Sequence, residues 1–165
     1  HEVKKLLFMG QEFGQEREWS EERELDWFLL ENHLNRGMLD YVAELLKIYR
    51  KYPSLYEFDA SWDGFEWVNA DDADRSIYSY IRKGSSGKNN ILVVLNMTPM
   101  RRNNYWVGVP NKGKYKLLLN SDEKRFGGNG GDIPSVINAT EGECDNRKYH
   151  LEFDLPSYGA AIFVF

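Results

Sequence analysis

The sequence has few of the residues that mark several common classes of protein. It contains one cysteine among 165 residues, so no disulfide can form within the chain. That residue, Cys144, lies in a polar stretch from Glu141 to Arg147, and nothing around it indicates a metal site or a nucleophile. Such sparse use of cysteine favours a reducing, cytoplasmic origin.

The sequence also lacks an excess of positive charge and any long apolar run. The formal net charge is −5, which argues against nucleic acid or an anionic membrane as the main partner, because both need a basic surface. No apolar run approaches the roughly twenty residues of a membrane-spanning helix. No signal peptide is evident, and the chain starts with His1 rather than Met, as processing or truncation would produce.

The histidines and the glycine-rich run show none of the spacings that bind metals or phosphates. His33 and His150 lie far apart and are interpreted as surface residues, and His1 is terminal, so no zinc pattern is present. Residues 126–131 are rich in glycine but lack the Lys-Ser/Thr pair of a phosphate-binding loop. The sequence therefore predicts no metal site and no cofactor.

Aromatic residues are abundant, at 15% of the chain, with ten tyrosines and five tryptophans. A β-rich core is the favoured explanation, since aromatic residues suit strands. Sugar binding is the alternative, because flat rings stack on pyranose faces. Trp62, Trp67 and Trp106 are interpreted as core or interface residues, whereas Trp19 and Trp27, in a polar loop, are expected to be functional.

The first third of the chain reads as a strand, a long loop and a helix. Val3–Met9 is a continuous apolar run of the kind found in buried parallel strands. A charged connection follows from Gln11 to Asn35. Gly37–Tyr52 has apolar residues at three- and four-residue spacing and is stopped by Pro53, which predicts a helix. Together these segments form one β/α unit.

The remainder of the chain has the pattern of an antiparallel β domain. Turn residues separate short strand-like segments, which indicates a sandwich or a barrel. Asn90–Asn96 is expected to be central, and residues 127–147 to be irregular. The boundary is placed near residues 53–63, giving units 1–55 and 56–165. The predicted strands are Phe65–Asn69, Ser76–Arg82, Asn90–Asn96, Asn104–Val109, Lys114–Asn120, Tyr149–Leu155 and Ala160–Phe165.

The long loop holds seven carboxylates between Glu12 and Asp26. An acid–base pair is one interpretation. A solvated acidic surface, partly neutralised by Arg17 and Arg23, is the favoured one. Glu12 is the best single candidate, because it lies just beyond the end of the predicted strand, where barrels built from β/α units carry their active sites.

Several motifs, in order along the chain, resemble one family. They are Lys5–Gln15 (KLLFMGQEFGQ), Glu18-Trp19, Leu25-Asp26-Trp27, Gly64–Trp67 (GFEW), Asn96–Pro99 (NMTP), and Leu119–Asp122 (LNSD) with Phe126–Gly128. Through these motifs the chain resembles the bacterial 1,4-α-glucan (glycogen) branching enzymes of the α-amylase superfamily, glycoside hydrolase family 13. The resemblance covers essentially the whole chain.

The resemblance implies a mainly β fold within a larger parent. The parent has an N-terminal β module, a (β/α)8 barrel and a C-terminal domain. This chain then corresponds to the last strand–loop–helix unit of the barrel, followed by the complete C-terminal antiparallel β-sandwich of the α-amylase type.

The resemblance also implies a glycosyltransferase activity for the parent. The family cuts an α-1,4 linkage in a glucan and transfers the freed segment to a C6 hydroxyl, forming an α-1,6 branch. Its retaining mechanism uses an Asp nucleophile, a Glu acid–base and a second Asp. None of the three maps onto this sequence, so no catalytic residue is predicted and the chain alone is expected to be inactive. The residues expected to bind glycogen or amylose are Glu12, Trp19, Asp26 and Trp27.

Two other functions remain open. The β-sandwich could be a free-standing carbohydrate-binding module, with aromatics such as Trp106 as its site, or a purely structural domain. A further expectation concerns Leu6–Met9, which has unpaired edges without the missing barrel. The segment should be displaced, packed on the β domain, or paired with a second copy of the chain.

Overall fold

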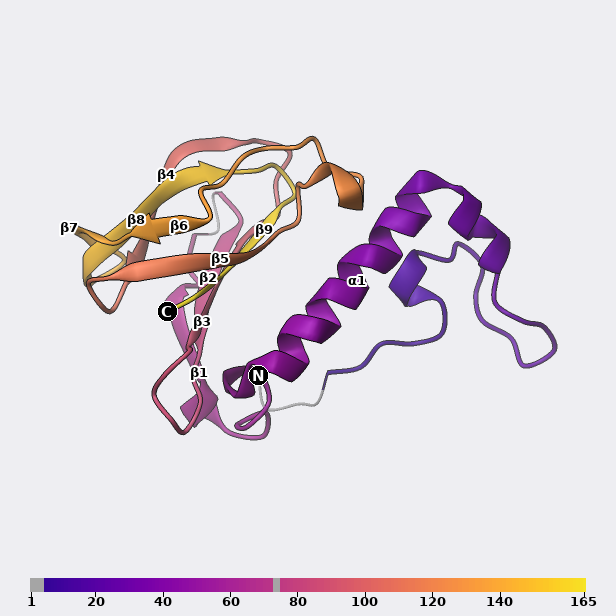
Figure 1. Cartoon of the computed structure of the whole chain (residues 1–165), viewed down its shortest axis with the longest axis horizontal. Helices are drawn as coiled ribbons and strands as arrows, with labels where there is room; N and C mark the ends of the chain where they lie inside the picture. The colour runs from indigo at the N-terminus through magenta and orange to yellow at the C-terminus, as the bar shows by residue number, and fades with distance from the viewer. Residues whose placement is uncertain (1–4, 73–74) are drawn as a thin grey trace.

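The computed structural model describes residues 5–72 and 75–165. Over these residues one α helix precedes nine β strands, with short 3-10 turns between them (Figure 1). The helix is α1 (His33–Lys51). The strands are β1 (Phe65–Asn69), β2 (Ile77–Arg82), β3 (Ile91–Asn96), β4 (Arg102–Val109), β5 (Lys114–Asn120), β6 (Val136–Asn138), β7 (Thr140–Cys144), β8 (Arg147–Leu155) and β9 (Ala160–Val164).

The strands form two antiparallel sheets. Six strands pair in the order β1-β2-β3-β9-β5-β6, and three pair in the order β4-β8-β7. Buried side chains from both sheets, such as Ile81, Val107, Leu151 and Phe163, form one apolar cluster between them. The fold is therefore a β-sandwich, as the sequence predicted, and β3 is central to the larger sheet.

The centre of the larger sheet is buried on both faces. Along β3, Leu92 and Val94 join the cluster inside the sandwich, while Ile91 and Val93 join a second cluster with Ile48 of α1. Two buried faces explain why β3 is a continuous apolar run rather than an alternating one. The molecule thus has three layers, with α1 lying along the outer face of the six-stranded sheet (Figure 1).

Helix α1 begins a turn earlier than predicted. Asn32 caps it, since its side chain accepts a hydrogen bond from the Leu34 backbone N–H (2.9 Å). At the other end Tyr52, which precedes Pro53, has an extended backbone and closes the helix. Gly37 allows a close approach, because a Cβ there would lie 2.7 Å from the Phe126 carbonyl carbon.

Residues 127–147 are not wholly irregular, which corrects the sequence prediction. They contain β6, which pairs with β5, and β7, which pairs with β8. Between β7 and β8, Asp145 and Asn146 both have positive φ values, of 51° and 58°. Two such residues make the tight hairpin turn whose twist suits antiparallel strands. The strands were missed because they are short and mostly exposed, with few apolar residues to mark them.

The strand predicted at Val3–Met9 is also not found. Its first two residues lie outside the described part of the chain, and residues 5–9 form no strand. Leu6 is 83% exposed, and Phe8 and Met9 are exposed as well. A strand of a parallel sheet needs hydrogen-bonding neighbours, and no strand of the described residues pairs with this segment.

The segment is instead held beside α1 by its first described residue. The Lys5 ammonium pairs with Asp59, donates to the Leu55 carbonyl (3.0 Å) and lies over the Tyr49 ring. Leu6 and Leu7 line an apolar groove of about 580 Å³ whose other walls are α1 and the six-stranded sheet. Of the three expected positions, this combines displacement with partial packing on the β domain.

Candidate functional site

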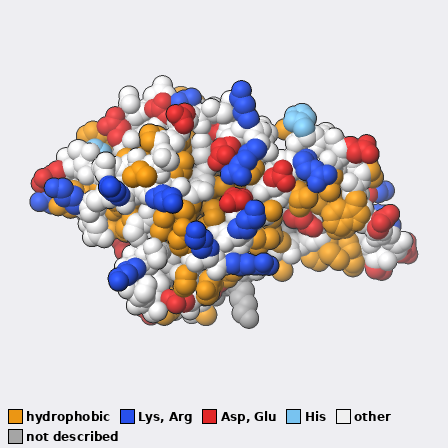
Figure 2. Space-filling model, in the orientation of Figure 1, with side chains coloured by type: hydrophobic (Ala, Val, Ile, Leu, Met, Phe, Trp, Pro, Cys, Tyr) orange, Lys and Arg blue, Asp and Glu red, His pale blue; other side chains and the backbone are white. Residues whose placement is uncertain are grey.

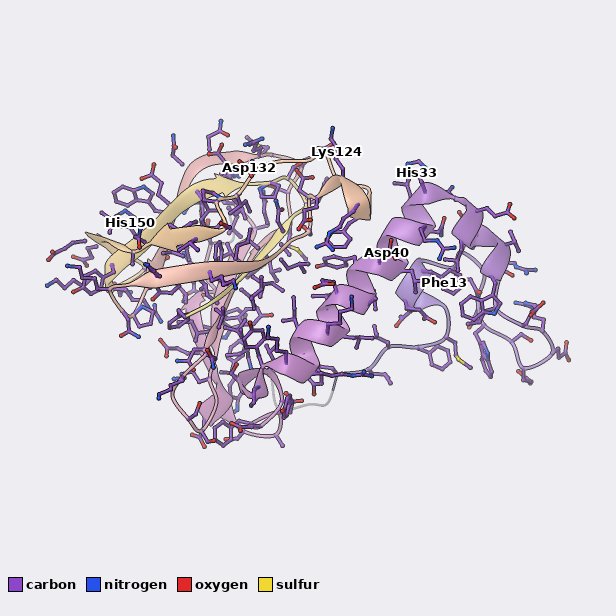
Figure 3. The ribbon with its side chains drawn as sticks, viewed as in Figure 1. Phe13, His33, Asp40, Lys124, Asp132 and His150 are labelled. Atoms are coloured by element: carbon purple, nitrogen blue, oxygen red, sulfur yellow. The ribbon has the colours of Figure 1, made fainter. Side chains whose placement is uncertain are left out.

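The long loop is anchored on the N-terminal half of α1. A 3-10 turn, η1 (Gln11–Phe13), starts and ends at glycines with positive φ, Gly10 and Gly14. It inserts the fully buried Phe13 against the helix, as Figure 3 shows. The Asn35 side-chain amide donates to the Phe13 carbonyl (2.8 Å). These contacts fix the place where the loop leaves the helix.

Glu12 lies within η1, and Trp19 lies farther along the loop. The Glu12 carboxylate is half-buried and accepts a hydrogen bond from the Gly10 backbone N–H (3.0 Å), which orients it across η1. The Trp19 ring meets Phe8 edge-on, with ring centroids 5.7 Å apart. Each residue therefore keeps part of its functional surface free.

Asp26 is buried and fully engaged. Its carboxylate accepts two hydrogen bonds from Arg17, one of them from Nε at 2.7 Å, and its backbone N–H donates to Gln15 (2.7 Å). The hydrogen bond from Arg17 lowers the Asp26 pKa below the ordinary value, although desolvation opposes this. Both carboxylate oxygens accept hydrogen bonds from Arg17. Asp26 therefore links two parts of the loop and is not available as a free acid.

Trp27 combines a packed face with an open one. It begins a second 3-10 turn, η2 (Trp27–Glu31), and its ring lies 5.0 Å from that of Phe13 at an interplanar angle of 30°. It remains 47% exposed. The structure thus brings Trp27 to the buried anchor of the loop, but no hydrogen bond or ring contact within the described residues joins it directly to Glu12 or Trp19.

The loop and helix expose an unusually apolar surface, which we call the N-terminal face. Figure 2 shows hydrophobic side chains gathered over this region, beside acidic groups at its edge. A large apolar patch on a protein surface marks an interaction site. The face consists of Leu6, Leu7, Phe8, Met9, Trp27, Phe28, Leu34, Met38 and Leu46, all of which are exposed.

The structure of the β domain bears on two further sequence interpretations. Trp62, Trp67 and Trp106 were expected in the core or an interface, and all three are exposed, so none of them lies in the core. His150 was expected at the surface, yet it is 3% exposed beneath the Trp106 ring. Only the alternation along β4 and β8, which places both side chains on the outer face of the smaller sheet, could have indicated this pair.

Neither metal nor membrane features stand out in residues 5–72 and 75–165. No group of three or more His, Cys, Asp or Glu side chains there is arranged to hold a metal ion. Helix α1, in that same part of the chain, is not apolar enough to cross a membrane. Cys144 is half-buried, and desolvation raises its thiol pKa to about 11, which makes it a poor nucleophile near neutral pH.

The fold and the sequence together define the class of this protein. Residues 67–165 match the alpha amylase C-terminal all-beta domain, and the chain belongs to that family. The whole chain is 64% identical to the 1,4-alpha-glucan branching enzyme GlgB of Butyrivibrio fibrisolvens, of which it covers 26%. It is 44% identical over 98% of its length to the same enzyme of Geobacillus stearothermophilus, of which it covers 25%.

The chain therefore spans about a quarter of the length of these curated relatives, and it matches their C-terminal region. Among solved structures, the trehalulose synthase MutB of Pseudomonas mesoacidophila aligns with a TM-score of 0.48 at 16% identity. That alignment covers 77% of this chain and 17% of the synthase.

Proposed function

We propose that this chain is the C-terminal part of a 1,4-α-glucan branching enzyme. The observation that carries the proposal is 64% identity along the full chain to such an enzyme. In the complete enzyme an α-1,4-glucan segment would be cut and moved to a C6 hydroxyl by a retaining mechanism. The required nucleophile and acid–base would lie outside this chain, whose role is to support them and to help bind glycogen or amylose.

The N-terminal face would dock against the rest of the enzyme. Burying exposed groups such as Leu6, Phe8 and Phe28 provides a favourable free energy, roughly 25 cal/mol for each Å² of apolar surface removed from water. The ion pair of Lys5 with Asp59 and the groove beside α1 already hold the segment near the β domain. Docking would cover the exposed side chains of residues 6–9 and position the loop behind them.

The loop would then form one wall of the glucan site. Trp19 and Trp27 offer partly free rings on which pyranose faces can stack. Glu12, oriented by the Gly10 N–H, can accept hydrogen bonds from sugar hydroxyls. Asp26 would act through Arg17, by holding the loop in the shape that presents the other three.

A branching assay on the isolated chain tests whether the catalytic residues lie outside it. Amylose incubated with the pure chain should show no shift of its iodine-complex absorbance and no new α-1,6 linkages, while the full-length enzyme should produce both. Reproducible branching by the pure chain would overturn the proposal.

Paired substitutions in the full-length enzyme test the loop. Glu12→Gln should lower kcat/KM for amylose by roughly tenfold or more, because the negative charge is lost and one of the two acceptor oxygens becomes an NH2 donor. Glu22→Gln removes an exposed carboxylate from the same loop and should leave the rate unchanged. Equal rates for the two variants would exclude Glu12 from the site.

Two narrower points stay proposals. A cytoplasmic location rests on the sparse use of cysteine and on the proposed glycogen substrate. We also propose that two copies of the isolated chain associate through residues 5–9, which would bury the apolar side chains that the rest of the enzyme would otherwise cover. Sedimentation of the chain at several concentrations would detect this association.

A further inference from the structure

Trp106 occupies an unusual position on the outer face of the smaller sheet. Its indole ring lies nearly parallel to the His150 imidazole, with centroids 3.8 Å apart and an interplanar angle of 15°. His150 is almost completely buried by this contact, yet Trp106 remains 45% exposed. Because His150 covers one face of the indole, the exposed area lies on the opposite face and the ring edges, which offer a flat aromatic surface.

This ring is held in place before any ligand arrives. The Trp106 Nε1–H donates to Glu152, its direct cross-strand partner on β8 (2.9 Å). His150 is fixed in turn, since its Nδ1 bonds to the Gly142 carbonyl (3.1 Å), and a carbonyl can only accept. Gly142 leaves room for the stack, because a Cβ there would lie 2.8 Å from His150 Cε1. A fixed ring loses little conformational entropy on binding.

Polar groups without partners lie beside the ring. The register of β4 slips between Arg102 and Tyr105, and the bulge exposes Asn103 and Asn104. Asn104 has a φ of 50°, which Asn tolerates better than most residues, and its backbone N–H donates to Asp154 (2.9 Å). Within the described residues, neither side-chain amide makes a hydrogen bond, so both can donate to and accept from a ligand.

These groups and Trp106 line one groove. It has a volume of about 580 Å³, and its polar lining includes Arg75, Arg101, Arg102, Asn103 and Asn104. Two of the three arginines are already neutralised, Arg75 by Asp72 and Arg101 by Asp154, and the carboxylate of Asp145, which also lines the groove, offsets the charge of Arg102. The groove is therefore suited to a neutral ligand rich in hydroxyl groups rather than to a phosphate or a polyanion.

We propose that the Trp106 groove is a glucan-binding site separate from the reaction site. Pyranose C–H groups would pack on the free indole face, whose π electrons attract their partial positive charge, and hydroxyls would bond to Asn103 and Asn104. The stacking surface follows from the geometry alone, whereas the choice of an α-1,4-glucan as ligand rests on the proposed function. Such a site would hold the polymer near the enzyme between reaction cycles.

The test titrates the 165-residue chain with maltoheptaose. Calorimetry should show binding, and the indole N–H signal of Trp106, assigned with Trp106→Phe, should shift in NMR spectra. Trp106→Ala should weaken binding by roughly tenfold or more, the usual effect of losing an aromatic stacking partner. Tyr158→Ala removes another exposed aromatic residue of the β domain and should bind as the wild type does.

Several results would overturn the site. They are the absence of maltoheptaose binding, a shift confined to other indoles, and full affinity in a folded Trp106→Ala chain. Equal affinity for cellohexaose, a β-1,4 glucan, would contradict the assignment to α-glucans. Because the indole shift is measured on the wild type, the test holds even if Trp106→Ala uncovers His150 and unfolds. None of these results bears on branching by the full-length enzyme, which the amylose assay tests separately.

Discussion

Two apolar runs of similar length differ in this molecule, because one forms a buried strand and the other remains exposed. Ile91–Val94 in β3 is buried on both faces, between the core of the sandwich and α1. Leu6–Met9 is at least as apolar, yet it forms no strand and is exposed throughout. A continuous apolar run therefore forms a strand only where neighbouring segments pair with it and cover both of its faces. For Leu6–Met9, no strand of the described residues supplies such a neighbour.

The largest expected effect contrasts a core side chain with one from the N-terminal face. Phe163→Ala, at a fully buried site of β9, should lower the free energy of unfolding by about 3–5 kcal/mol, because it leaves a cavity between the sheets. Phe28→Ala, on η2, should change it by less than about 0.5 kcal/mol. Urea denaturation followed by circular dichroism measures both. Similar losses would show that the N-terminal face is part of the folded core.

Adding one methyl group at Gly37 should weaken the contact between α1 and the β domain. Alanine favours a helix over glycine by about 1 kcal/mol. Gly37→Ala should nevertheless destabilise the chain by about 1–3 kcal/mol, since the new Cβ meets the backbone of η5 (Lys124–Phe126), which must shift. A stabilised Gly37→Ala chain would mean that the helix does not dock closely there.

The loop should show a smaller and pH-dependent effect. Arg17 lowers the pKa of Asp26 in the folded chain, so this pair stabilises the loop above the ordinary Asp pKa of 3.8. The contribution should vanish as pH falls from 3.8 through the lower folded value. The NMR signal of the Arg17 Nε–H should weaken over that range and should be weak at every pH in Asp26→Asn. A signal that survives below the range would show that the pair does not hold the loop.

The sequence predicted the strongly patterned parts of this fold. The bounds of β1 and β5 match the predicted ones, because turn residues and clear apolar spacing mark their ends. The short polar strands β6 and β7 were missed, since they depend on pairing with β5 and β8 and not on burial. The Asp145-Asn146 turn was the available signal for the β7–β8 hairpin.

The candidate site was less predictable than the fold. Motifs placed Glu12, Trp19, Asp26 and Trp27 in one loop, but no pattern showed that Arg17 would occupy both oxygens of Asp26. The site on the outer face of the smaller sheet could not be predicted for a similar reason. A buried histidine beneath an exposed tryptophan requires the register of two strands and the absence of a side chain at Gly142, which local sequence does not report.

Hydrogen exchange, compared between the isolated chain and the full-length branching enzyme, tests the central claim most directly. Amides of β3, β8 and β9 should be equally protected in both proteins, because the sandwich core is complete in this chain. Amides of residues 5–9, which form no strand and are exposed here, should exchange rapidly in the isolated chain and roughly a hundredfold or more slowly in the full-length enzyme, where docking would bury them. Equal exchange of residues 5–9 in the two proteins would contradict the claim that the N-terminal face docks against the rest of the enzyme.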